Sequence, residues 1–274
     1  MDNEDERPDL TRVLSSTTPD GTLVLTLHGP KRRNALSMPT VAELDAALDR
    51  AVQDEGVRVV VLTGSGSHFT AGVDLKASSF GDDEGGTAPV TPVPGLDAIH
   101  RTLDKLYRLP KPTIAAVEGC AVGVGWGFAL ACDLTIAAKS AFFQAPFTAM
   151  GLVPDGGCAW FLTQAIGVRR AAELLLHAQR LDATRAEHLG LVNRVVGPGQ
   201  AAEEARADAA RLATGAQDAL RLTKHVLRAA ERTPGYRDFL DVERVTAALA
   251  LRGPEPREGV RAFREGRRPD FGGA

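Results

Sequence analysis

Cysteines are few in this 274-residue sequence, and they form no recognisable pattern. Cys120, Cys132 and Cys158 are odd in number and lack the close spacing of metal ligands. This argues against a disulfide framework and against a zinc site. We therefore expect three buried, unreactive thiols and no bound metal.

Long apolar runs and a strong charge of one sign are also absent. No apolar stretch reaches the roughly 20 residues of a membrane-spanning helix, so we expect no membrane insertion. The 32 basic and 35 acidic residues nearly cancel, and the formal net charge of -3 creates no field that would attract nucleic acid. A negatively charged ligand would have to be bound by local contacts.

The N-terminus lacks the positive charge of a targeting peptide. Its first six residues include Asp2, Glu4, Asp5 and Glu6. We therefore expect a cytoplasmic protein, in which residues 1–10 form a disordered acidic tail.

What is present is the pattern of an α/β protein. Apolar segments at 21–27, 59–63, 113–117 and 134–137 are typical of strands, and helical periodicity separates them at 41–52, 98–109 and 125–131. Ser37 and Pro39 are suited to the start of the first of these helices. Alternating strands and helices predict a largely parallel sheet with helices packed against it.

Composition divides the chain into a core and a tail. We place an α/β core at 11–198, interrupted at 76–95 by a segment rich in Gly, Pro, Ser, Thr and Asp that we interpret as a mobile flap. Beyond Pro198 the pattern is wholly helical, so residues 199–274 are predicted to form a helical module. Its apolar content indicates packing against the core or another subunit.

Two glycine-rich loops, 62–75 and 117–127, each follow a predicted strand. Such loops can present free backbone NH groups, and a helix start adds its positive dipole end, so together they could stabilise an oxyanion. Two alternatives remain. A dinucleotide site is disfavoured because the G-x-G-x-x-G phase is not met, and the glycines could instead serve close packing.

Four segments in order resemble the crotonase, or enoyl-CoA hydratase/isomerase, superfamily: 30–36, 71–75, 119–127 and 258–263. The resemblance covers nearly the whole chain. It implies a β-β-α spiral core and a C-terminal helical module that forms a homotrimer or a dimer of trimers. It also implies acyl-CoA or enoyl-CoA substrates of fatty acid metabolism, with coenzyme A entering as part of the thioester and no separate cofactor.

The resemblance places the two oxyanion-hole NH groups on Val73 and Val124. Family members commonly have glycine at the second position, and a β-branched residue avoids positive φ. Val124 could alternatively do no more than pack its helix.

The same resemblance implies contacts with the coenzyme A part of the substrate. The implied residues are Lys31, Arg32, Ala71, Asp74, Leu75, Lys76 and Phe263. The alternatives are a solvated basic loop at 31–33 and a helix-core role for Phe263.

Asp155 is the predicted catalytic acid/base. Family hydratases hold water between two glutamates, at positions that are Gly127 and Phe147 here, and neither residue can move a proton. The segment 151–157 instead resembles the isomerases that place one carboxylate after a proline, including the ring-epoxyphenylacetyl-CoA branch. Asp155 could alternatively form a turn or cap a helix.

Three other functions remain as alternatives. One is an atypical hydratase (a lyase), and another is an acyl-CoA-binding protein without turnover. The third, an aryl-CoA dehalogenase, uses a nucleophilic Asp supported by His and Trp. The matching positions are interpreted as Asp104 and Phe147, which disfavours that chemistry.

Overall fold

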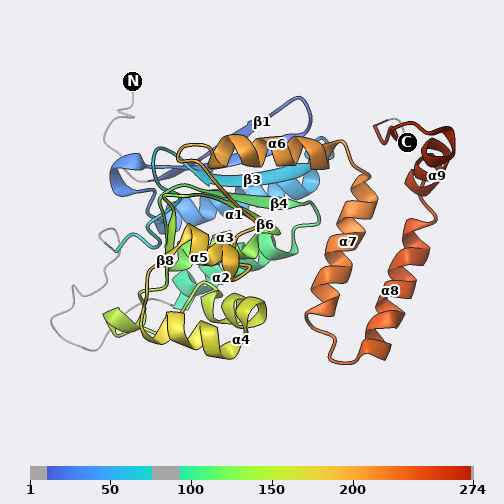
Figure 1. Cartoon of the computed structure of the whole chain (residues 1–274). Coiled ribbons are helices and arrows are strands. Elements are labelled where there is room, and N and C mark those ends of the chain that lie inside the picture. The colour runs from blue at the N-terminus through green and yellow to red at the C-terminus, as the bar shows by residue number, and fades with distance from the viewer. Residues whose placement is uncertain (1–10, 76–92, 273–274) are drawn as a thin grey trace, which may run out of the picture.

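Six strands form the main sheet, in the order β1-β2-β3-β4-β6-β9. The computed structural model describes residues 11–75 and 93–272 (Figure 1). The strand β1 is antiparallel to β2, and all other neighbours in this sheet are parallel, as predicted. The bounds are β1 (Arg12–Thr17), β2 (Thr22–His28), β3 (Val59–Gly64), β4 (Thr113–Val117), β6 (Leu134–Ala138) and β9 (Arg194–Val196).

Three short strands form a second sheet, in the order β5-β7-β8. Its strands are β5 (Cys120–Val122), β7 (Phe142–Gln144) and β8 (Leu181–Asp182). Only Glu118 and Gly119 separate β4 from β5, so the chain turns directly from one sheet into the other before it enters the next helix. This β-β-α path brings the second glycine-rich loop to the junction of the two sheets.

Side chains of the main sheet are buried alternately on its two faces. On β3, Val60 and Leu62 belong to the larger core, whereas Val59 and Val61 belong to the smaller one. The larger core includes α1 (Met38–Gln53), α2 (Val93–Arg108) and α3 (Val124–Ala131), and the smaller one includes α6 (Ala201–Ala213). Burial on both faces explains the continuous apolar runs of these strands.

Most of the predicted elements are present, with shifted ends. The side chain of Ser37 caps α1 by accepting a hydrogen bond from Thr40 N at 3.3 Å, and Pro39 lies in its first turn. The helix α2 begins at Val93, so the last three residues of the predicted flap are helical, and its residues 76–92 lie outside the described part. The predicted acidic tail 1–10 also lies outside it.

The remaining helices follow the second sheet and the end of the core. They are η2 (Pro30–Arg32), η3 (Thr148–Met150), α4 (Cys158–Leu176), α5 (Ala183–His188), α7 (Gln217–Ala230), α8 (Tyr236–Ala250) and α9 (Glu255–Glu265). None of the helices within 11–75 and 93–272 is both long and apolar enough to cross a bilayer.

The helices after residue 199 pack in two different ways. Figure 1 shows α6 lying across the main sheet, whereas α7, α8 and α9 stand beside it. Four alanines of α6 are fully buried against the sheet, so this helix packs as part of the core. The helices α8 and α9 and the connection between them expose large apolar side chains: Leu240, Val245, Leu249, Leu251, Val260 and Phe263.

Candidate active site

The two glycine-rich loops lie side by side. Phe69 N donates to Glu118 O at 2.7 Å, Thr70 N donates to Cys120 O at 2.9 Å, and Val122 N donates to Thr70 O at 3.1 Å. These bonds align the first loop with β5. A Cβ atom added at Gly72, where φ is +85°, would lie 2.5 Å from Val122 O. The close approach of the two loops therefore requires glycine at this position.

The peptide between Gly72 and Val73 is oriented by a hydrogen bond from Leu36, which lies just before α1. Leu36 N donates to Gly72 O at 2.7 Å. The C=O and N–H groups of a trans peptide point in opposite directions, so the Val73 N–H points away from Leu36. Among the described residues no acceptor for this N–H is found. The Val73 N–H is thus available to a ligand.

The peptide between Gly123 and Val124 is oriented in the same way. Gly123 O accepts bonds from Trp126 N at 3.0 Å and from the Cys158 thiol at 3.3 Å, which turns the Val124 N–H to the opposite side. Burial raises the pKa of Cys158 to about 12, so its thiol stays protonated as a donor. In the described ranges, the Val124 N–H has no acceptor, and it lies at the positive end of α3.

Valine at position 124 is compatible with this geometry. The positive φ of +56° belongs to Gly123, the N-cap of α3, and Val124 itself is helical. Its side chain is 2% exposed and belongs to the larger core. Both interpretations of Val124 are therefore compatible: its side chain packs in the core, and its N–H has no acceptor in the described part of the chain.

The segment that carries Asp155 packs on the start of α3. A Cβ atom at Gly156 would lie 2.8 Å from Val124 Cα, and one at Gly127 would lie 1.9 Å from Gly156 O. Asp155 is therefore next to a residue that touches Val124. Position 127, where family hydratases hold a glutamate, has no room for a side chain with this backbone.

The two carboxylate oxygens of Asp155 differ in their contacts. Its Oδ1 accepts from Gly156 N at 2.6 Å and lies 2.7 Å from His100 Nε2. For Oδ2 no partner is found within the described part of the chain, and the side chain is 22% exposed. The N-cap of α4 is Gly157, so Asp155 forms a turn without capping that helix.

Phe147 covers the second loop. Its ring atom Cζ lies 3.7 Å from the Cβ position of Gly123, and the side chain is 9% exposed. It stands where the family's hydratases hold their second glutamate. The surface above the Gly123 to Val124 peptide is therefore apolar on this side.

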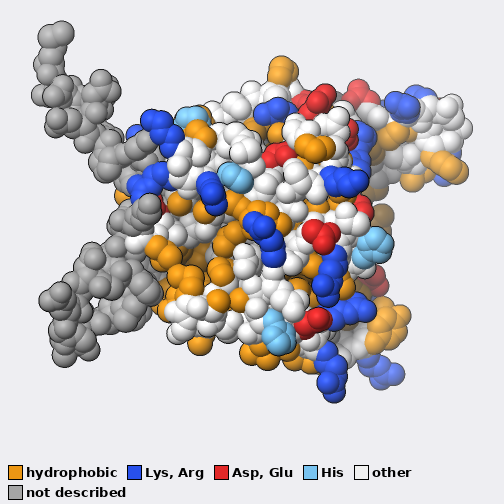
Figure 2. Space-filling model, turned by 60° about the vertical axis from the view of Figure 1, so that its left-hand side comes forward, with side chains coloured by type: hydrophobic (Ala, Val, Ile, Leu, Met, Phe, Trp, Pro, Cys, Tyr) orange, Lys and Arg blue, Asp and Glu red, His pale blue; other side chains and the backbone are white. Residues whose placement is uncertain are grey.

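Five of the predicted coenzyme A contacts gather at one edge. The Arg32 guanidinium donates to Asp74 Oδ1 at 2.8 Å, and Asp74 is only 4% exposed. This ion pair ties η2 to the first loop, next to the half-buried Ala71 and the exposed Lys31 and Leu75. On the face of the molecule drawn in Figure 2, basic and hydrophobic side chains lie among acidic ones.

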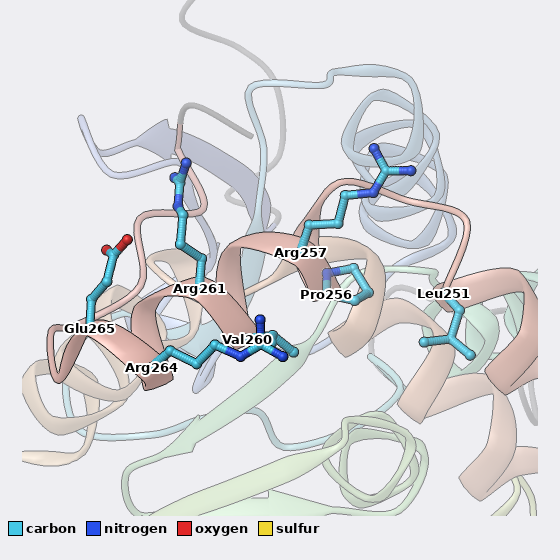
Figure 3. A pocket seen from close by; sticks show the side chains of 7 residues that line it. All are labelled: Leu251, Pro256, Arg257, Val260, Arg261, Arg264 and Glu265. Carbon is cyan, nitrogen blue, oxygen red and sulfur yellow. The ribbon is translucent and has the colours of Figure 1, made fainter.

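The other two predicted contacts are not joined to this edge. Lys76 lies outside the described residues. Phe263 is 87% exposed on α9, a helix that stands apart from the core within one chain (Figure 1). Other residues of α9 line a cavity of about 610 Å³, and its lining includes Leu251, Arg257, Val260, Arg261 and Arg264 (Figure 3).

Asn34 is a buried residue of this site that the sequence analysis did not single out. It is fully buried with φ +55°, and its Nδ2 donates to Ser65 O at 3.0 Å and to His68 O at 2.7 Å. Gly29 N donates to its Oδ1 at 2.9 Å. The signal was present in the segment 30–36, because asparagine tolerates left-handed backbone better than most residues.

His100 is the second residue that was missed. It lies 55 residues from Asp155 in the sequence, so no local pattern joins the two. Asp104, which we matched to the dehalogenase histidine, is one helical turn further on and binds Arg108 at 2.6 Å. The histidine beside Asp155 is therefore present, at position 100.

The remaining titratable groups near the loops have structural roles. Burial, followed by the charge of Arg33, lowers the pKa of His68, whose Nδ1 accepts a bond from Cys120 N at 3.3 Å. The three cysteines are unpaired and buried. Over the described ranges, no three His, Cys, Asp or Glu residues are grouped as metal ligands.

The whole chain is similar to known proteins. A family profile described as enoyl-CoA hydratase/isomerase matches residues 17–274. The 1,2-epoxyphenylacetyl-CoA isomerase of Escherichia coli K12 is 37% identical over 253 residues, which cover 92% of this chain and 95% of that protein.

Solved structures extend the similarity to the fold. An enoyl-CoA hydratase from Polaromonas sp. JS666 superposes with a TM-score of 0.89 at 36% identity, covering 94% of this chain and 99% of that one. An enoyl-CoA hydratase from Bacillus anthracis gives a TM-score of 0.88 at 30% identity, covering 96% and 100%. The expected crotonase fold is confirmed, while the names of these relatives divide between isomerase and hydratase.

Proposed function

The chain belongs to the enoyl-CoA hydratase/isomerase family, and we propose that within it the protein is an enoyl-CoA isomerase with Asp155 as its single acid/base. The observation that carries this proposal is the pairing of one carboxylate with the Val124 peptide. Asp155 is adjacent to the start of α3, and its Oδ2 has no partner in the described part of the chain.

The contacts of positions 127 and 147 support isomerisation over hydration. Hydration needs two proton-transfer groups that hold a water molecule. A side chain at Gly127 would collide with Gly156 O, and Phe147 presents an apolar ring. Moving a double bond needs one group only, because the proton removed at one carbon is returned at another.

In the proposed reaction the thioester oxygen accepts hydrogen bonds from the Val73 and Val124 N–H groups. Asp155 Oδ2 removes a proton from C2 or C4 of the enoyl chain, and the electron pair of that C–H bond moves into the enolate. The two N–H groups stabilise the negative oxygen. The proton then returns at the other end of the allyl system, so the double bond is shifted and the carboxylate is regenerated.

Coenzyme A would bind at the edge formed by Lys31, Arg32, Ala71, Asp74 and Leu75. Because Arg32 is bound to Asp74, we assign it to holding the loop more than to binding phosphate. No separate cofactor is needed, since the backbone N–H groups supply the electrophile. We further propose a cytoplasmic trimer or dimer of trimers in fatty acid metabolism.

Phe263 would enter the substrate site only through assembly. Its side chain is 87% exposed on α9, next to other exposed apolar residues. In the proposed trimer, this surface would meet a neighbouring subunit. A trimeric mass in solution that becomes monomeric when Phe263 and Val260 are replaced by Ser would support this arrangement.

The test of the proposed function is a direct comparison of two reactions of the wild-type protein. A 3-enoyl-CoA is followed for the ultraviolet absorbance of the conjugated 2-enoyl product, and crotonyl-CoA is followed for loss of that absorbance by hydration. We expect isomerisation to be faster by at least about a hundredfold. Faster hydration would favour an atypical hydratase.

Tight binding of acyl-CoA without any turnover would favour the third possibility, an acyl-CoA-binding protein. Isothermal titration with a non-reactive saturated acyl-CoA measures this binding separately. The panel of substrates should include the ring epoxide of phenylacetyl-CoA, because a relative with 37% identity is named for that reaction.

A second candidate reaction follows from the contact between His100 and Asp155. A nucleophilic aspartate beside a histidine is the arrangement implied by the aryl-CoA dehalogenase branch, although Phe147 stands in place of the tryptophan. In that reaction Asp155 Oδ2 displaces halide from the ring, and water then hydrolyses the aryl ester. Release of halide from a 4-halobenzoyl-CoA tests it.

A further inference from the structure

We infer that His100 is a positioning residue, which holds the Asp155 carboxylate by one oxygen so that the other oxygen is presented to the substrate. This inference rests on the proposed function. His100 lies in the second turn of α2, and its Nε2 is 2.7 Å from Asp155 Oδ1. The bond joins two elements that are 55 residues apart.

The direction of this hydrogen bond is set by the chemistry of the partners. An ionised carboxylate can only accept, so Nε2 of His100 carries the hydrogen. Gly156 N also donates to Oδ1, at 2.6 Å. Two donors from different directions therefore converge on one oxygen atom.

This convergence fixes the side chain of Asp155. The backbone N–H of the next residue alone would leave the carboxylate free to rotate and exchange its two oxygens. A second donor from α2 removes that freedom and determines where Oδ2 lies. A proton shuttle between two carbons depends on this position, because a small displacement of a reacting group has a large effect on rate.

The contact is a poor candidate for a purely stabilising ion pair. The His100 side chain is 54% exposed, and exposed pairs of this kind contribute little to stability. Two charged residues that follow His100 on α2 have other partners: Arg101 Nε lies 4.0 Å from Asp45 Oδ1, and Asp104 binds Arg108. His100 is the one side chain among the described residues that binds Asp155.

The test compares His100→Ala with His100→Gln. Glutamine places an amide N–H donor at nearly the same distance from the backbone as Nε2 but does not titrate. We expect His100→Ala to lower kcat about 10- to 100-fold with little change in KM, and His100→Gln to recover most of the loss. The thermal midpoint should change by no more than about 2 °C in either variant.

The matched control is Asp104→Asn, one turn further along α2 and similarly exposed, with a 57% exposed side chain against 54% for His100. It should keep wild-type kcat. Unchanged kcat in His100→Ala would overturn the inference. So would equally low kcat in both His100 variants, because the imidazole would then be moving protons itself.

A measurement without turnover separates this inference from the proposed function. The ¹⁵N chemical shifts of the His100 ring in the substrate-free protein should report a protonated Nε2, and they should change in Asp155→Asn. A ring with unprotonated Nε2 would contradict the contact even if the protein is an active isomerase. Conversely, if the ¹⁵N shifts are as expected but a 3-enoyl-CoA is not isomerised, the proposed function is rejected and the contact is not.

Discussion

Asp133 and Asp155 have equally exposed side chains, 22% each, yet their surroundings differ. Both oxygens of Asp133 are occupied: Oδ2 binds Thr113 N, Thr113 Oγ1 and Lys224 Nζ, and Oδ1 binds Arg228 at 3.0 Å. Asp155 has two donors on Oδ1, and within the described residues it has none on Oδ2. Exposure alone does not distinguish the two carboxylates.

The difference lies in what each carboxylate joins. Asp133 follows α3 and neutralises two cations of α7, so it fastens the C-terminal helices to the core. Burial lowers the pKa of Lys224, which shows that this cation depends on its neighbours for compensation. Asp155 joins α2 to a turn, and among the described residues its Oδ2 has no partner. A saturated carboxylate is suited to structure, and a partly saturated one is suited to chemistry.

The largest expected effect is on activity, in Asp155→Asn. The amide keeps the shape of the side chain but cannot accept a proton, so kcat for isomerisation should fall by about a thousandfold. The free energy of unfolding should change by less than about 1 kcal/mol, because the amide oxygen of Asn can still accept both bonds that reach Oδ1. Enzyme kinetics and urea unfolding measure the two quantities, and undiminished turnover would remove Asp155 from the mechanism.

Asp133→Asn should give the opposite pattern. Lys224 and Arg228 would lose their shared anion, and Lys224 is buried, so we expect a loss of roughly 3 kcal/mol in the free energy of unfolding. Activity per folded molecule should stay close to that of the wild type. A large loss of kcat at full stability would show that the division between the two aspartates is wrong.

Gly127→Ala tests whether the position of Asp155 depends on backbone packing. The new Cβ would lie 1.9 Å from Gly156 O, so the turn that carries Asp155 must move. We expect a loss of about 2 kcal/mol in stability and at least a tenfold loss of kcat. As a control, Gly253→Ala alters a glycine between α8 and α9 that has no positive φ, and its new Cβ would lie 3.5 Å from Ala250 O, an ordinary contact distance. Full activity of Gly127→Ala would mean that the turn adapts freely.

The smallest expected effect concerns pH and the attachment of α7. Burial, followed by the hydrogen bond to Glu231, raises the pKa of Tyr107 to about 12. A raised phenol pKa stabilises the fold below the unfolded value near 10, and this contribution is lost as the pH rises toward 12. We expect about 1 kcal/mol of stability to be lost between about pH 10 and pH 11.

Tyr107→Phe removes the titrating group and should remove that part of the pH dependence. Urea unfolding at several pH values gives the free energy of unfolding of both proteins. The contributions of other titrating groups cancel in the difference between the two. An identical pH profile in the two proteins would show that Tyr107 does not titrate differently on unfolding. The profile of isomerase activity below pH 9 should be unaffected by the substitution, because Phe keeps the ring that packs on Trp160 and Phe161 and removes only the hydroxyl that bonds Glu231.

Local patterns predicted much of this molecule. The strands and the first helices follow from apolar periodicity, and α1 begins at the expected Ser37 cap. The short strands of the second sheet were not predicted, since two or three residues carry too little pattern. The helix α6 was assigned to the C-terminal module because its helical pattern does not reveal that its alanines pack on the sheet.

The sequence by itself determined the two loops and their glycines. A backbone N–H exists whatever side chain its residue carries, so the family resemblance could assign the two oxyanion-hole donors to Val73 and Val124 without side-chain information. The doubt about Val124 concerned one local quantity, because a β-branched residue avoids positive φ. In the structure the positive φ belongs to Gly123.

Only the tertiary structure decided what surrounds Asp155. The donor from His100, the lack of space at Gly127 and the distance of Phe263 from the loops all depend on contacts between residues far apart in the chain. Side-chain partners are selected by packing, and one helical turn separates His100, which binds Asp155, from Asp104, which does not. A sequence pattern without three-dimensional contacts cannot distinguish these two positions.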